Sequence, residues 1–72
     1  MDKRAVLSLL AQARQRAEGG DLGIAWQHEV ITELERRGLN SVKARAILQR
    51  LITAQEVDLT EMERLLDELD EG

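Results

Sequence analysis

The sequence predicts an all-α protein, built as a helical hairpin or as three helices over residues 3–18, 21–37 and 41–70. Ala, Leu, Glu, Arg and Gln dominate the 72 residues and proline is absent, so the chain is rich in residues that lose least on entering a helix. Apolar residues recur every three or four positions, which is the period of one helix face. Glycines interrupt this pattern at two places, and we expect the helices to end there.

The first helix is expected from about Lys3 to Glu18, because one apolar stripe runs through this segment at helical spacing. The stripe consists of Val6, Leu9 or Leu10, Ala13 and Ala17. Gly19 and Gly20 follow, and two glycines cost a continuous helix about 2 kcal/mol relative to alanines. Because Asp21 is available as an N-cap for the next helix, we predict a break or kink at the double glycine.

The second helix is expected from about Leu22 to Arg37. Its apolar face comprises Ile24, Ile31 and Leu34, flanked by Trp26 and Val30. Glu33 precedes Arg37 by four residues, a spacing that predicts an ion pair on the helix surface.

The third helix is expected to begin after Gly38, which is placed to stop the second helix in the left-handed conformation, with Asn40 or Ser41 as its cap. A coiled-coil-like seam then follows, formed by Leu48, Ile52, Leu59, Met62, Leu66 and Leu69, with Gln55 as its one polar position. A capping-box pattern at Thr60–Glu63 offers an alternative in which the helix breaks at Val57-Asp58. The absence of Gly and Pro from this run favours one long helix.

A fold-back at residue 39 has consequences for both arms of a hairpin. Positions equally distant from that residue then lie side by side, so Gly19 is expected to face Leu59. Lys3 and Arg4 are expected near the acids of the other chain end, namely Asp67, Glu68, Asp70 and Glu71. Basic groups there would relieve the unfavourable interaction of those acids with a helix C-terminus.

Charge predicts that two parts of the chain pair, and size predicts self-association. Residues 1–50 carry nine Lys/Arg against six Asp/Glu, whereas residues 51–72 carry one against eight, so the two parts are expected to pair within one molecule or across a dimer. A chain this short buries only roughly 60% of its unfolded surface, and without cysteine it has no disulfides to compensate. We therefore expect a homodimer that packs its apolar seams into a helical bundle.

The expected interface residues are Trp26, Val30, Ile31, Leu34, Leu48, Ile52, Leu59, Met62, Leu66 and Leu69. Trp26, the only aromatic residue, either anchors the interface or fills a gap beside the glycines. The acidic end of the chain is either a solvated helix face or a surface for a basic partner.

Length and composition favour binding over catalysis. His28 is the only histidine, and its helical neighbours Ala25, Ile24, Ile31 and Thr32 offer neither a metal ligand nor a partner base. No phosphate-binding loop or enclosed pocket is expected, so we predict no enzyme activity, no cofactor, no metal and no small-molecule substrate. No apolar run approaches the ~20 residues that span a bilayer, and no signal-peptide core forms. The sequence thus predicts a single cytoplasmic domain over residues 1–72, an adaptor or inhibitor that binds an unidentified protein through a helical surface.

The alternative interpretation is a helix-turn-helix transcriptional regulator that uses residues 41–51 as its recognition helix. The candidate nucleic-acid contacts are Lys43, Arg45, Gln49 and Arg50. Leu34, four residues before Gly38, is large for a tight helix crossing, and the net charge of −4 weakens the electrostatic attraction to DNA. A plain helical corner is therefore favoured at this turn.

The segment from Ile24 to Gln55 carries a loose pattern of Ile, Gln, Ile, a Leu-Glu pair, Gly, Ala and Leu. The matching positions are Ile24, Gln27, Ile31, Leu34, Glu35, Gly38, Ala44 or Ala46, and Leu48. In this pattern the segment resembles a family of small uncharacterised helical proteins from alphaproteobacteria. The resemblance implies no particular activity, cofactor or partner.

Overall fold

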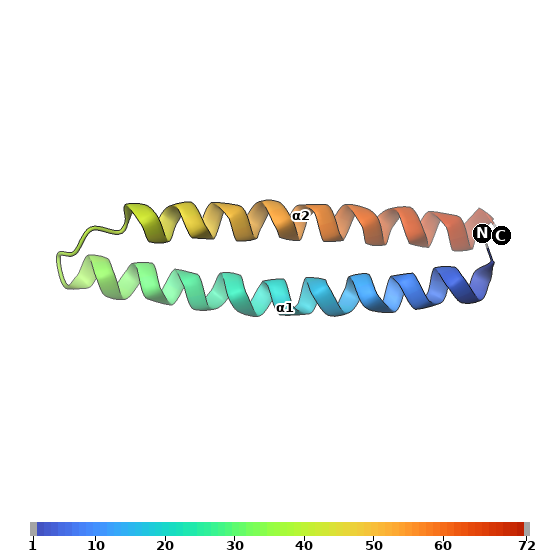
Figure 1. The fold of residues 1–72 in the computed structure, drawn as a ribbon, viewed down its shortest axis with the longest axis horizontal. Coiled ribbons are helices and arrows are strands. Elements are labelled where there is room, and N and C mark those ends of the chain that lie inside the picture. Colours follow the sequence, from blue (N-terminus) through green and yellow to red (C-terminus); the bar gives the residue numbers. More distant parts are fainter. Residues whose placement is uncertain (1, 72) are drawn as a thin grey trace.

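The computed structural model describes residues 2–71 and forms a hairpin of two helices, α1 over Lys3–Arg36 and α2 over Val42–Glu71. The helices run antiparallel and side by side, so both chain ends lie at one end of a rod of 54 × 14 × 13 Å (Figure 1). The described part of the chain contains no strand. The all-α hairpin is confirmed, and the three-helix alternative is not formed.

The turn between the helices uses the residues that the sequence predicted. Gly38 has a φ of 71°, the left-handed conformation that glycine adopts without steric cost, and α1 ends just before it. The Asn40 side-chain oxygen accepts a hydrogen bond from the Val42 N–H at 2.8 Å. The Ser41 carbonyl accepts the first helical bond of α2, from the Arg45 N–H at 2.9 Å. Both predicted capping residues therefore take part in starting α2.

The predicted break at Gly19 and Gly20 is wrong, because α1 continues through both glycines. Gln55 of α2 lies against Gly20, and its amide oxygen occupies the place where a Cβ atom would stand. The Gln55 amide nitrogen donates to the Ala17 carbonyl at 2.9 Å and to the Asp21 carboxylate at 2.6 Å. Gly20 therefore allows a close approach between helices rather than a turn, and Asp21 bonds across the hairpin instead of capping a helix.

The core is a thin seam between the two helices. Its buried residues are Val6, Ala13, Ala17 and Ile31 of α1 with Ala44, Gln55 and Leu65 of α2. Its innermost cluster joins Val6, Ala13 and Leu65, and partly buried Leu10, Met62 and Leu69 pack against that cluster. The stripe predicted for α1 is confirmed, and so is the preference for one uninterrupted helix through Val57-Asp58.

The seam predicted for α2 is wrong at two positions. Leu59 and Leu66 are 46% and 48% exposed, whereas Leu65 is completely buried. The line that faces α1 passes through Gln55 and the partly buried Asp58 instead of Leu59. The sequence pattern favours an apolar path through Leu59, but polar side chains can occupy the seam when they have partners across it.

The register of the hairpin also differs from the prediction. Gly20 meets Gln55, whereas a symmetric fold-back would place Gly19 beside Leu59, so the two arms are displaced by about one helical turn. The cause is visible at the loop, which runs back along the end of α1 before α2 begins (Figure 1).

The basic start of the chain and its acidic end do lie at the same end of the rod (Figure 1). Among the described side chains, however, no ion pair joins Lys3 or Arg4 to Asp67, Glu68 or Asp70. The expected proximity is therefore confirmed for the start of α1 and the end of α2, but not for ion pairs between these side chains.

Candidate interaction surfaces

More large apolar side chains lie on the surface of the hairpin than in its core. Those exposed within the described chain are Leu7, Leu9, Leu22, Trp26, Leu39, Val42, Ile47, Val57, Leu59 and Leu66. By contrast, the large apolar residues that are buried there are Val6, Ile31 and Leu65. Single exposed apolar residues are ordinary, but several of these lie on two helix faces.

The first surface, here called the α2 flank, consists of Leu7, Ile52, Leu59 and Leu66. The three α2 residues are seven positions apart and therefore line up along one side of the helix. Leu7 of α1 and Leu66 line one shallow depression, whose walls also include Leu10, Met62 and Arg14. The α2 flank is thus an apolar strip beside the seam.

The second surface, here called the Trp26 face, consists of Gly19, Leu22, Gly23 and Trp26 on one side of α1. These positions follow the i, i+3, i+4, i+7 spacing of a single helix face. Leu22 and Trp26 are 75% and 65% exposed, and a Cβ atom added at Gly19 or Gly23 would meet open space. Trp26 therefore does not fill a gap beside the glycines, and that alternative is wrong.

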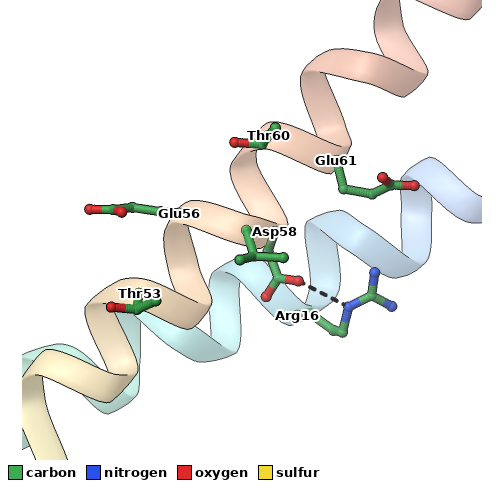
Figure 2. Close-up of a pocket in the computed structure, with 7 residues that line it drawn as sticks. Arg16, Thr53, Glu56, Asp58, Thr60 and Glu61 are labelled. Carbon is green, nitrogen blue, oxygen red and sulfur yellow. Dashed lines mark hydrogen bonds and ion pairs between the residues drawn. The ribbon is translucent and has the colours of Figure 1, made fainter.

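An open depression beside α2 contains one of the ion pairs between the two helices (Figure 2). Arg16 of α1 points across to α2 and donates to the Asp58 carboxylate at 3.3 Å. The remaining lining residues are Thr53, Glu56, Val57, Thr60 and Glu61. A hydrogen bond from Arg64 lowers the pKa of Glu61, which makes its carboxylate a weak base. These residues have the features of an ion-pair network, which can hold the two helices together.

Two further arginine-bound carboxylates surround the loop. Glu33 accepts from Arg36 at 2.6 Å and from Arg37 at 2.7 Å, which confirms the predicted Glu33–Arg37 pair. These hydrogen bonds, with that from Arg36 the stronger, lower the pKa of Glu33. Glu35 reaches across the turn to Arg45, and this bond is the main cause of its lowered pKa.

The corner between the helices lacks the shape of a DNA-reading motif. In a helix-turn-helix the two helices cross at about 90–120°, whereas α1 and α2 lie antiparallel (Figure 1). Among the candidate nucleic-acid residues, Arg45 is held by Glu35, while Lys43, Gln49 and Arg50 line shallow depressions on the outer side of α2. The predicted helical hairpin is confirmed at this corner, while DNA binding by residues 41–51 remains untested.

The expected interface residues divide into two groups by burial. Ile31 is buried between the helices, where Val30, Leu34, Leu48, Ile52, Met62 and Leu69 are partly buried. Trp26, Leu59 and Leu66 remain exposed. Contact of any of these residues with a second molecule stays a prediction.

Three residues of these surfaces and of the core were not singled out from the sequence, namely Leu7, Leu22 and Leu65. Leu65 lies on a line of residues three or four positions apart that runs through Gln55. The same line passes through the charged Asp58, so the sequence pattern does not mark it as an apolar seam. Leu7 and Leu22 lie off the apolar stripe of their own helix, so only their exposure in the hairpin draws attention to them.

His28 is exposed on α1. Within residues 2–71, no group of three or more metal-ligating side chains comes together. Neither described helix combines the length and the apolar character that crossing a membrane requires.

No family model, curated protein or solved structure matches the chain. The family resemblance of residues 24–55 therefore stays a prediction.

Proposed function

We propose that this protein is a non-catalytic interaction module, an adaptor or inhibitor that acts as a homodimer and binds another protein through a helical surface. The observation that carries the proposal is the Trp26 face, on which Leu22 and Trp26 stand exposed one helical turn apart. Apolar side chains at this spacing are the anchors with which a helix docks into an apolar groove. Tryptophan is also among the residues that contribute most at the centres of protein interfaces.

The surroundings of these anchors support the same function. Gly19 and Gly23 leave the helix surface bare beside them, so a partner can approach the backbone of α1 closely. Exposed Gln15 and Glu29 lie seven residues before and after Leu22, and they give the face a polar edge at both ends. An apolar centre with a polar rim is the usual composition of a protein interface.

Partner capture with matched variants tests the proposal. Proteins that the wild-type chain retains from its source cells are purified, and their affinities for wild type and for Trp26→Ala are measured. Because Trp26→Ala removes the only tryptophan of the chain, both affinities are measured by titration calorimetry rather than by fluorescence. We expect Trp26→Ala to weaken binding about thirtyfold or more, the effect of losing an interface hot spot.

The matched control is Val57→Ala, which removes an exposed apolar side chain from α2, outside both surfaces. This variant should bind as the wild type does. If every purified partner binds Trp26→Ala and wild type equally well, the Trp26 face is not the binding surface and the proposal fails.

A further inference from the structure

We propose that a second copy of the chain docks on the α2 flank in the antiparallel orientation, with the two-fold axis of the dimer near Leu59. Each loop end then points toward the chain ends of the other copy. This inference rests on the homodimer proposed above and specifies the surface and the direction of its pairing.

The exposed area of the hairpin matches what a dimer needs. A compact monomer of 8.1 kDa exposes about 4,500 Å², whereas the hairpin exposes 5569 Å². The excess of about 1,000 Å² is close to the ~800 Å² that each partner contributes to a standard protein interface. One copy laid along another removes surface of that size.

The α2 flank has the geometry of a bundle interface. Each helix of a four-helix bundle needs an apolar stripe wider than the two positions that fill a simple coiled-coil seam. Ile52, Leu59 and Leu66 supply that third position, directly beside the seam. Because Ile52 and Leu66 are equally distant from Leu59, an antiparallel copy places Ile52 against Leu66 and each Leu59 against its equivalent.

Charge decides between the two possible directions. The bond between Asp21 and Gln55 joins the midpoints of the arms and divides the rod into a loop half and a terminal half. Residues 22–55 of the loop half carry five Lys/Arg and three Asp/Glu, a net charge of +2, while the rest carries five against eleven, a net charge of −6. A parallel dimer would set the two −6 halves together, whereas the antiparallel dimer about Leu59 sets residues 63–71 of each α2 against residues 47–55 of the other copy, which belong to the loop half.

In the antiparallel orientation, Arg45 is the basic residue of the α2 flank line that lies toward the acidic end of the other copy. It lies seven residues before Ile52 and hence on the line of the α2 flank, where an antiparallel copy brings its acidic C-terminal end. Trp26 belongs to the outer side of α1 and stays free in this dimer, so self-association and binding of another protein use different surfaces.

A distance between labelled loops tests the direction. The chain has no cysteine, so Leu39→Cys gives one spin label in the exposed loop of each copy. With the axis at Leu59, the loops lie about 50 Å apart, from 1.5 Å per residue along α2 on both sides of the axis. In a parallel dimer they lie within about 25 Å, the width of two helices.

Light scattering of two aspartate variants tests the surface. Leu59→Asp places two charges at the axis, and we expect the dissociation constant of the dimer to rise about a hundredfold or more. Val57→Asp introduces the same charge two residues away, on a side chain that is 64% exposed, and should leave the dimer unchanged.

Each outcome decides. A dimer with a loop distance near 50 Å that only Leu59→Asp dissociates supports the proposal, and if Leu59→Asp does not fold, the loop distance in the otherwise native chain decides alone. A dimer with a short loop distance, or one that survives Leu59→Asp, overturns the pairing described here but leaves a homodimer. A chain that is monomeric at every concentration overturns both the pairing and the homodimer, while partner binding at Trp26 is judged separately.

Discussion

Two neighbouring glycines of α1 should respond to the same substitution with opposite signs. Gly19 faces open space, so Gly19→Ala removes only the conformational cost of glycine in a helix and should stabilise the protein by about 1 kcal/mol. For a domain of this size, the expected rise in Tm is about 4–8 °C. Gly20→Ala makes the same change one residue later, where a side chain occupies the space.

At Gly20 the new methyl group would overlap the amide oxygen of Gln55. The Gln55 side chain is flexible in isolation, but here it is buried and held by its bonds to Ala17 and Asp21. Moving it removes two hydrogen bonds of about 0.5–1.5 kcal/mol each. It also leaves a buried amide without hydrogen-bond partners, which costs about 1–3 kcal/mol. After the gain of about 1 kcal/mol from alanine, these losses leave Gly20→Ala destabilising by about 1–5 kcal/mol.

Urea unfolding followed by circular dichroism measures both effects, at one fixed protein concentration because self-association changes apparent stability. The double variant Gly20→Ala with Gln55→Ala completes a mutant cycle, in which the loss from Gly20→Ala should largely disappear. If Gly20→Ala stabilises the protein as Gly19→Ala does, the close approach of Gln55 does not govern this part of the seam.

Three further predictions follow from the seam, the ion pairs and the corner. Leu65→Ala should cost about 2–5 kcal/mol in urea unfolding, whereas Leu66→Ala should cost less than half as much in dilute solution; equal losses would contradict the buried position of Leu65. Because Arg45 lowers the pKa of Glu35, its stabilisation is complete above a pH of about 4.3 and is lost as pH falls through the lower folded-state pKa. Glu35→Gln should therefore lower Tm at neutral pH but not at pH ~2, and a constant difference would refute this pair. Random duplex DNA should show no binding at about 50 mM salt, and tight, salt-dependent binding would favour the regulator instead.

Much of the hairpin was predictable because local backbone and capping preferences do not depend on the rest of the fold. Gly38, Asn40 and Ser41 mark the turn by their own backbone and capping properties, and they act in the structure as predicted. The apolar stripe of α1 was likewise correct, because helical spacing alone puts Val6, Ala13 and Ala17 on one face.

The seam of α2 was not predictable in the same way. Two lines of residues along α2 could face α1, one through Leu59 and Leu66 and one through Asp58 and Leu65. The choice depends on which polar groups find partners across the hairpin, and Arg16 supplies one for Asp58. The same limit applies to the candidate surfaces, since exposure of Leu7 or Leu22 is a property of the folded pair of helices.

By itself the sequence determined that the chain is helical and turns near Gly38, because composition, spacing and capping act within a few residues of each other. Only the tertiary structure decided that the double glycine stays helical, which register the two arms take and which apolar side chains remain outside. These features depend on contacts between residues far apart in the chain, such as Gly20 and Gln55, whose close fit outweighs the helical cost of a single glycine.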